Sequence, residues 1–375
     1  MKLTTSDKQL RKPLVWLEID TKELLQNIKS WRNLVGATRM MAVVKANAYG
    51  LGAAESASYV EEYADAFGAV GIAEALKLRE AGITKPIVNL GIYSPDDAVA
   101  LIDSNITPTI FTDSSFRDFE SKARQKRTTA DAWIKIDTGL CRLGIPYQDG
   151  VQFIRNISRS SWVKIEAVYS TLTEDPKFDS EQLNRFIGLR EECEKLGISV
   201  PIWSIASSAA ICVSKDFTLD MVRVGLPMFG YYPSQEARDA KSIALEPVVS
   251  FKTRVACVKE LEKDESACYR RAFVARERTR IAVLLPGYSY GLESRLASGG
   301  CVLINGERFP IVGITATNCF VDIGMNKNIQ AGDEAVLFGK QGNSEILLEE
   351  VCRVVNQMPY EFLSRIPEKV TRVYV

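Results

Sequence analysis

The sequence of 375 residues contains no histidine. Histidine is the commonest metal ligand in proteins and the side chain most often used as a general base near neutral pH. Its absence therefore excludes histidine-dependent catalytic triads, metalloprotease motifs and most zinc sites. We expect no metal centre, and any acid-base chemistry must rely on lysine, tyrosine, cysteine or carboxylate side chains.

The chain also lacks excess charge, long apolar runs and paired cysteines. Basic and acidic residues number 47 each, which favours a small-molecule partner over nucleic acid or an anionic membrane. No stretch approaches the roughly 18 apolar residues of a membrane span, and residues 1–13 have no apolar core of the kind found in targeting segments. The eight cysteines form no C-x-x-C pair, so we expect free thiols and a cytoplasmic protein.

Strand and helix patterns alternate over the first two thirds of the chain, which indicates an α/β fold. Eight such units suggest a parallel (β/α)8 barrel of the TIM type, whose catalytic groups lie at the C-terminal ends of the strands. A doubly wound open sheet fits the periodicity nearly as well. The expected strands are residues 40–44, 66–72, 86–92, 107–111, 132–136, 163–169, 202–206 and 221–224.

Near residues 242–247 the pattern changes to short strands broken by glycines and charged turns. Only residues 344–355 have a helical pattern in this part. We therefore predict two domains, a barrel over residues 1–244 and a C-terminal, mostly β domain over residues 245–375. The strands expected in the second domain are residues 248–258, 280–285, 301–304, 309–314, 320–323 and 335–338.

A single lysine, Lys45, ends the apolar run 40–44 and leads into Asn47, Tyr49 and Gly50, residues that favour a tight exit from a strand. In apolar surroundings the charged form of lysine is disfavoured, so its pKa falls and the free amine can form a Schiff base with an aldehyde. For an isolated V-K pair, a lysine that snorkels to water is the commoner outcome.

The longer string V-V-K-A-N-A-Y-G-x-G resembles the lysine motif of the alanine racemase family of fold type III, which depends on pyridoxal 5'-phosphate (PLP). The resemblance extends over nearly the whole chain. It favours the barrel over the open sheet and implies PLP as cofactor, a small amino-acid substrate and a homodimer with active sites at the interface. Lys45 would be the PLP lysine and one catalytic base, and Tyr49 a phosphate contact.

Three further segments of the barrel resemble motifs of that family. The first is K-I-D-T-G-L-C-R-L-G-I, which implies that Arg142 approaches the phenolic oxygen of PLP and the substrate carboxylate. In the same segment, Lys135 matches a lysine that carries a carbamate in many members of the family, so it is a possible carbamate here. An ordinary ion pair at a strand end is the alternative for these two residues. A-S-S-A-A implies Ser208 as a phosphate ligand. D-M-V-R-V-G implies Arg223 at the pyridine nitrogen, with Gly225 beside the cofactor.

In the second domain, L-P-G-Y-S-Y-G resembles the segment whose tyrosine acts as the second catalytic base from the opposite subunit, here Tyr288. M-P-Y-E implies that Tyr360 closes over the phosphate. C-Y-R-R-A-F places Tyr269 at the substrate entry, and V-G-I-T-A-T-N places Thr317 among the substrate contacts.

The chain departs from the family pattern at several positions. Thr171 replaces the histidine that supports the catalytic tyrosine, and Leu51 replaces the histidine of the lysine motif. Thr317 and Asn318 stand in place of a Met-Asp pair that seats the substrate carboxylate. These changes concern substrate or second-base chemistry, while the expected cofactor ligands are retained.

The sequence therefore predicts a PLP-dependent amino-acid racemase that interconverts L- and D-alanine with two bases, Lys45 and Tyr288 of the partner subunit. The alternatives are a diverged PLP-binding homologue with another amino-acid substrate, or a catalytically weak carrier or regulatory protein. A decarboxylase of the same fold is less supported, because no cysteine-aspartate motif of that group is present. The missing histidines exclude metal-assisted PLP aldolases.

Overall fold

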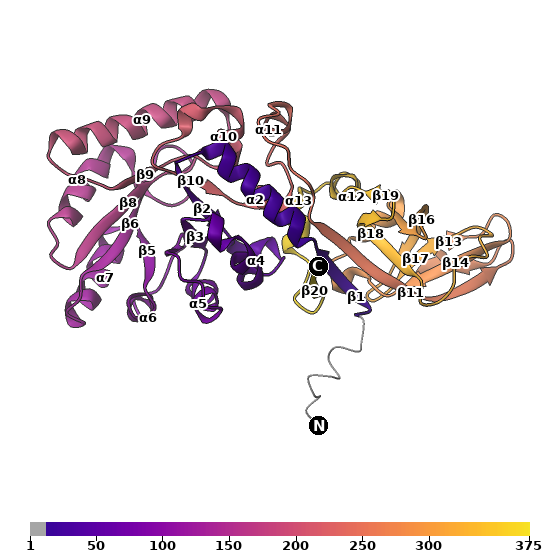
Figure 1. The fold of residues 1–375 in the computed structure, drawn as a ribbon. Helices are drawn as coiled ribbons and strands as arrows, with labels where there is room; N and C mark the ends of the chain where they lie inside the picture. Colours follow the sequence, from indigo (N-terminus) through magenta and orange to yellow (C-terminus); the bar gives the residue numbers. More distant parts are fainter. Residues whose placement is uncertain (1–12) are drawn as a thin grey trace. The chain divides into compact units, whose positions relative to one another are not determined.

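The computed structural model describes residues 13–375, which form two compact units (Figure 1). The barrel unit is Lys22–Glu246, and the β unit combines Pro247–Val375 with the N-terminal stretch that ends at Thr21. The prediction that residues 1–13 contain no targeting segment concerns a stretch of which residues 1–12 lie outside the described residues. Within residues 13–375, no helix has both the length and the hydropathy needed to cross a membrane.

Eight parallel strands form the barrel unit, in the order β10-β2-β3-β4-β5-β6-β8-β9. The first and last of these strands approach each other, because Ser207 and Arg223 form a parallel bridge and Asp220 N donates to Trp203 O at 3.0 Å. The barrel is thus nearly closed, which confirms the TIM-type prediction over the open sheet. The strands are β2 (Arg39–Val43), β3 (Ala66–Ala69), β4 (Ile87–Asn89), β5 (Ile106–Ile110), β6 (Ala130–Asp137), β8 (Val163–Tyr169), β9 (Ile202–Ser204) and β10 (Met221–Val224), with the short β7 (Ile145–Pro146) paired to β6.

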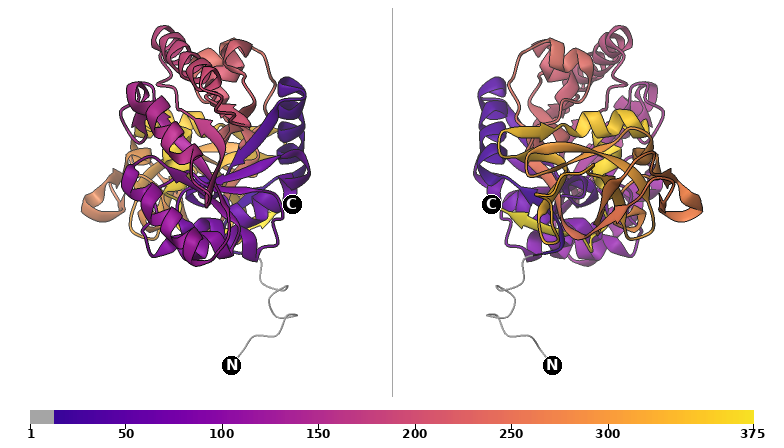
Figure 2. Two further views of the ribbon diagram at one scale, coloured as in Figure 1. Left: turned by 90° about the vertical axis from the view of Figure 1, so that its left-hand side faces the viewer. Right: turned by 90° about the vertical axis from the view of Figure 1, so that its right-hand side faces the viewer.

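Helices lie outside the barrel strands (Figures 1 and 2). In α9, Asp175 caps the first turn by accepting hydrogen bonds from Lys177 N and Phe178 N, and Pro176 occupies the first turn, where it is tolerated. Gly36, with φ of 61°, follows the end of α2. The helices are α2 (Thr21–Val35), α3 (Lys45–Tyr49), α4 (Ala53–Val60), α5 (Ile72–Glu80), α6 (Asp97–Asp103), α7 (Asp113–Gln125), α8 (Tyr147–Ser158), α9 (Pro176–Lys195), α10 (Ser208–Val213) and α11 (Gln235–Asp239).

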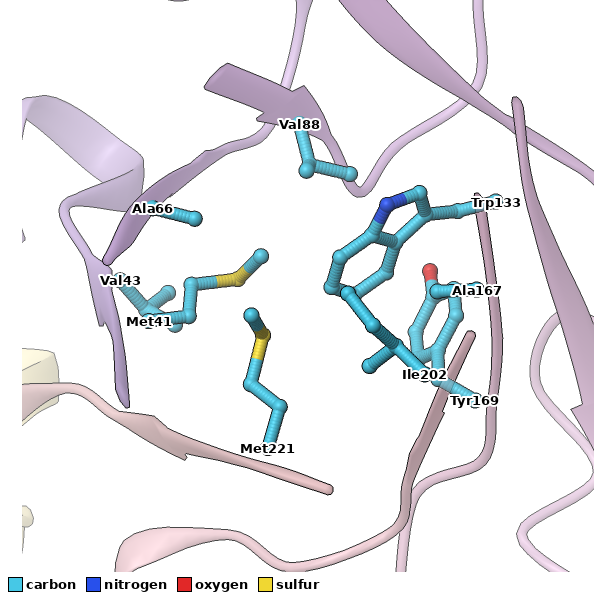
Figure 3. Packing of buried hydrophobic residues seen from close by; sticks show 9 residues of the cluster. All are labelled: Met41, Val43, Ala66, Val88, Trp133, Ala167, Tyr169, Ile202 and Met221. Atoms are coloured by element: carbon cyan, nitrogen blue, oxygen red, sulfur yellow. The ribbon is translucent and has the colours of Figure 1, made fainter. Parts of the chain in front are cut away.

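Side chains from the strands fill the barrel interior, so the barrel is a packed core rather than a pore (Figure 3). Trp133 and Tyr169 pack edge to face with ring centroids 5.7 Å apart, and Met41 and Met221 approach from the opposite side. The Tyr169 hydroxyl shares a hydrogen bond with Thr109 Oγ1 at 3.1 Å. The cluster comprises Met41, Val43, Ala66, Val88, Trp133, Ala167, Tyr169, Ile202 and Met221.

The β unit contains one nine-stranded sheet in the order β19-β18-β15-β16-β17-β14-β11-β1-β20, and β18 also pairs with β11. A two-stranded ribbon, β12 with β13, adds to it. The strands are β1 (Val15–Ile19), β11 (Val249–Leu261), β12 (Ser266–Ala267), β13 (Phe273–Val274), β14 (Thr279–Leu284), β15 (Cys301–Ile304), β16 (Glu307–Ile314), β17 (Cys319–Asp322), β18 (Glu334–Gln341), β19 (Ser344–Ile346) and β20 (Thr371–Tyr374), with helices α12 (Leu348–Val355) and α13 (Pro359–Ser364).

Three features of the β unit differ from expectation. β1 joins this unit and not the barrel, because it pairs antiparallel with β11 and parallel with β20. Residues 344–346 form β19, so the helix expected from residue 344 begins only at Leu348. A second helix, α13, starts at Pro359, where proline is favourable because the first helical position needs no N–H donor.

Candidate active site

Lys45 lies two residues after the end of β2, at the C-terminal edge of the barrel, and begins a left-handed turn. Residues 46–49 have φ values of 53°, 54°, 52° and 57°, a conformation that costs about 1–2 kcal/mol for each non-glycine residue. Glu74 Oε1 accepts a hydrogen bond from Asn47 N at 2.5 Å, and Asn47 Oδ1 accepts one from Ala53 N at 2.9 Å. These contacts hold the strained turn that presents Lys45.

The Lys45 amine is half-buried and has no hydrogen bond or ion pair within the described part of the chain. Burial lowers its pKa first, and the nearby Arg142 and Arg223 guanidiniums lower it further. Glu174 and Glu74 act in the opposite direction but do not reverse the shift. A larger fraction of the amine is therefore neutral and nucleophilic than for a lysine in water.

Arg223 on β10 is buried and is fixed by three hydrogen bonds. Its Nη1 donates to Ser204 Oγ at 2.6 Å, and its Nη2 donates to Ser170 O at 2.6 Å and to Ile205 O at 3.2 Å. Its guanidinium carbon lies 5.3 Å from the centre of the Tyr169 ring. Burial lowers the Arg223 pKa to about 10, so the guanidinium stays charged at neutral pH.

Lys135 on β6 is only 4% exposed and has no carboxylate partner within residues 13–375. Its Nζ donates to Thr171 Oγ1 at 3.0 Å and lies 4.5 Å from the centre of the Tyr169 ring. Burial, followed by repulsion from Arg223 and Arg142, lowers the Lys135 pKa to about 7. The ion pair considered for this residue is therefore absent, and the amine is partly neutral at physiological pH.

Arg142 lies in the loop after β6, and its guanidinium is exposed, with no hydrogen bond within the described residues. Asp137 Oδ1 shapes this loop by accepting hydrogen bonds from Gly139 N at 2.8 Å and Cys141 N at 3.1 Å. Gly144 has φ of 131°, and a Cβ there would lie 2.6 Å from Asp137 N. The backbone of this loop is thus held in place, while the Arg142 guanidinium remains available to bind a ligand.

Hydroxyl groups gather around Gly225, just after β10. Ser208 Oγ accepts a hydrogen bond from Gly225 N at 3.2 Å, and a Cβ at Gly225 would lie 2.2 Å from the Tyr49 hydroxyl oxygen. Burial raises the Tyr49 pKa, which keeps this phenol a neutral O–H donor. Ser207 Oγ is buried without a hydrogen-bond partner among the described residues.

These groups fit PLP. The Lys45 amine, whose pKa is lowered by burial, stands where an aldehyde can attach. The cluster of Tyr49, Ser207, Ser208 and Gly225 supplies hydroxyl donors and close backbone approach for a phosphate. Four cations, Lys45, Lys135, Arg142 and Arg223, are near enough to influence one another. Such a positive cluster suits a cofactor and a substrate that both carry negative charge.

In the β unit, the structure brings the segments of Tyr288 and Thr317 together. Tyr288 N donates to Thr315 O at 3.0 Å, and Ser289 N donates to Ala316 O at 2.9 Å, so the loop that carries Thr317 runs against the Tyr288 turn. Gly287 permits this approach, because a Cβ there would lie 2.1 Å from Thr315 O. The Tyr288 side chain is 57% exposed.

Tyr269 and Tyr360, the other two residues implied in this part of the chain, are also exposed. Tyr269 begins the short 3-10 helix Tyr269–Arg271 and is 80% exposed, and Tyr360 lies on α13 and is 47% exposed. Their roles, like those of Tyr288 and Thr317, stay predictions.

Sequence reasoning missed three residues that support the site: Glu74, Ser204 and Gln182. Each acts on a residue far along the chain: Glu74 bonds Asn47 27 positions away, and Gln182 bonds Thr138 44 positions away. Tyr169, which packs beside Lys135 and Arg223, was also not predicted as part of the site. Its position at the end of a predicted strand could have indicated it, because every second side chain along a barrel strand faces the interior.

Comparison with known proteins identifies the family. The chain matches the family descriptions "Alanine racemase, N-terminal domain" over residues 19–233 and "Alanine racemase, C-terminal domain" over residues 248–374. It is 32% identical to the alanine racemase of Methanococcus maripaludis, over 96% of this chain and 98% of that one. It is 33% identical to the alanine racemase of Carboxydothermus hydrogenoformans, over 96% of this chain and 99% of that one.

Solved structures give the same result. The alanine racemase of Clostridium difficile 630 superposes with a TM-score of 0.92 at 28% identity, covering 97% of this chain and 96% of that one. The alanine racemase of Bartonella henselae, solved with covalently bound pyridoxal phosphate, superposes with a TM-score of 0.85 at 26% identity, covering 97% and 100%. With both domains matched in order, the chain belongs to the alanine racemase family of PLP-dependent isomerases.

Proposed function

We propose that this enzyme interconverts L- and D-alanine with two bases, Lys45 and Tyr288 of the partner subunit. The observation that carries the proposal is the Lys45 amine, which is presented by a strained turn, has no hydrogen-bond partner in the described chain, and has a lowered pKa among three other cations. When bound to Lys45, PLP supplies the electron sink that acidifies the Cα proton of an amino acid.

The residues of the barrel unit bind and orient the cofactor. Tyr49, Ser208 and Gly225 would hold the phosphate, and Arg142 would hold the phenolic oxygen and the substrate carboxylate. Arg223 would place its permanent charge beside the ring nitrogen of bound PLP and would keep that atom unprotonated. The cofactor would then be a weaker electron sink, which would favour return of the proton to Cα over transamination.

Racemisation requires a proton to leave one face of Cα and another to arrive on the opposite face. Lys45 Nζ serves one face. The Tyr288 hydroxyl, exposed on its own β unit, serves the other face from across a homodimer interface. Tyr269 and Thr317 contact the substrate at the entry and limit it to a small side chain.

Lys135 carries a carbamate in this proposal. Its neutral amine attacks CO2, an N–C bond forms, and one proton leaves to solvent, which gives an anion at the former ammonium position. The lowered Lys135 pKa of about 7 supports this reaction, because only the neutral amine is nucleophilic. The anion would offset the charges of Arg142 and Arg223, which both act on Lys135. A carbonyl signal from 13C-labelled bicarbonate that disappears in Lys135→Arg is the expected result.

The eight cysteines are free thiols, which supports a cytoplasmic location. The proposed function is tested by incubating PLP-loaded protein with L-alanine and measuring D-alanine with a stereospecific oxidase, beside L-serine and L-lysine as competing substrates. We expect alanine to be fastest. A well-folded protein that binds PLP but turns over none of the three would reject the proposal, and a faster rate with serine or lysine would reject alanine as substrate.

A further inference from the structure

Helix α9 places a polar side chain, Gln182, on its buried face beside Leu183 and Phe186. Gln182 has no exposed surface. Burying an amide costs free energy unless its donors and acceptor find partners. The partners of Gln182 therefore explain what this amide does on a helix face whose other buried polar side chain is Asp179.

The Gln182 amide joins the ends of two barrel strands. Its Nε2 donates to Thr138 Oγ1 at 2.9 Å, just after β6, and to Thr171 O at 3.1 Å, just after β8. Its Oε1 accepts a hydrogen bond from Thr173 N at 2.9 Å. Two donated bonds and one accepted bond require an amide, because a carboxylate cannot donate and an apolar side chain can do neither.

Both loop positions held by Gln182 lead directly to an active-site cation. Thr138 Oγ1 shares a hydrogen bond with Ser170 Oγ at 2.8 Å, and Ser170 O accepts from Arg223 Nη2 at 2.6 Å. Thr171, whose carbonyl binds Gln182, uses its Oγ1 to accept from Lys135 Nζ at 3.0 Å. The Gln182 amide is therefore connected to Lys135 by two successive hydrogen bonds, through Thr171, and to Arg223 by three, through Thr138 and Ser170.

We propose that Gln182 is a positioning residue, whose amide fixes Arg223 through Thr138 and Ser170 and fixes Lys135 through Thr171. The inference rests on the proposed function for its catalytic consequence only, because the placement of the two cations is a property of the chain without cofactor or substrate. In the histidine-free site, the Thr171 hydroxyl is the group that reaches Lys135, so its backbone must be held in place.

The first test compares Gln182→Met with Asn27→Leu. Asn27 is a matched control, because it is also a buried amide of the barrel unit with three hydrogen bonds, to Met228 O and to both backbone groups of Glu246. Both variants should lower the melting temperature. Only Gln182→Met should lower kcat for alanine, by at least tenfold, with KM changed less than threefold.

The second test reads Lys135 in the cofactor-free protein. Competitive lysine acetylation across a pH series, quantified by mass spectrometry, gives the titration midpoint of Lys135. In Gln182→Met the freed loop admits water, so the midpoint should rise by at least one pH unit, while in Asn27→Leu it should stay at the wild-type value. A Gln182→Met protein with wild-type midpoint and kcat, destabilised like Asn27→Leu, would reduce Gln182 to a structural residue and overturn the proposal.

Two further variants keep the test decisive. If Gln182→Met does not fold, Thr138→Val breaks the link to Ser170 at constant volume and should lower kcat in the same way. Gln182→Glu should be partly rescued at acid pH, where the protonated acid regains one donor; no rescue there, together with an unaffected Thr138→Val, contradicts the proposal. Failure of wild-type protein to racemise alanine would reject the function but leave the Lys135 midpoint as a valid test of positioning.

Discussion

Glu74 Oε1 accepts the backbone N–H of Asn47 at 2.5 Å, inside the left-handed turn that presents Lys45. The four left-handed residues store about 4–8 kcal/mol at the usual cost per residue. Strain of this kind persists only where surrounding contacts impose it, and it concentrates at functional sites.

We therefore predict that Glu74→Ala relaxes the turn. The variant should lose about 1–3 kcal/mol of unfolding free energy in urea, the cost of leaving a partly buried donor without its acceptor. It should also bind PLP covalently more slowly. Glu80→Ala, an exposed change at the end of the same helix, is the control. Equal rates of covalent PLP binding in the two variants would show that the turn keeps its conformation without the Glu74 hydrogen bond.

Lys45 should carry the cofactor. After borohydride reduction of PLP-loaded protein, peptide mass spectrometry should find the pyridoxyl group on the peptide that contains Lys45, because this amine is more often neutral than an exposed lysine. Lys45→Ala should remove both the adduct and the protein-bound PLP absorbance. An adduct confined to Lys135, the other buried amine of the site, would contradict the assignment.

Arg223 should decide which reaction occurs. Arg223→Glu allows the ring nitrogen of PLP to be protonated, so the electron sink strengthens and transamination competes. Racemisation should fall by about a hundredfold, equivalent to about 2.7 kcal/mol, and pyruvate should form from alanine. Arg223→Lys keeps the charge and should form no pyruvate. Unchanged racemisation in Arg223→Glu would exclude this role.

Lys135 should make stability depend on pH. Its pKa is about 7 in the folded chain, against an ordinary value of 10.5. Between these values the unfolded chain binds a proton that the folded chain does not, so stability rises with pH, by about 1.4 kcal/mol per unit for this group. In CO2-free buffer, urea unfolding should show this rise between pH 7 and 9 in wild-type protein and in the exposed control Lys164→Met, but a smaller rise in Lys135→Met.

Tyr288 should be required for racemisation and not for cofactor binding. Tyr288→Phe should bind PLP normally and lose at least a hundredfold in L-to-D turnover, while Tyr290→Phe, two residues away, should stay within threefold of wild type. Near wild-type L-to-D turnover in Tyr288→Phe would show that the second base lies elsewhere.

The strands of the barrel could be predicted from the sequence, because they are short and mostly apolar runs. Barrel closure could not be predicted from periodicity, since an open sheet has the same alternation; the pairing of β10 with β2 and the bridge between Ser207 and Arg223 decide it. The cluster of cations followed from motifs. Its supports did not, because Glu74 and Gln182 bond residues distant in sequence and lie in ordinary helical patterns.

The strand β1 lies between β11 and β20, so the sheet of the β unit needs residues from both ends of the chain. On the ribosome, β1 emerges first, the whole barrel unit follows, and β20 emerges after everything else in that sheet. Residues Val15–Ile19 must therefore wait through most of translation without their hydrogen-bonding partners. The barrel can form while the sheet stays open, and the last strand of this sheet to be synthesised is the one that covers the outer edge of β1.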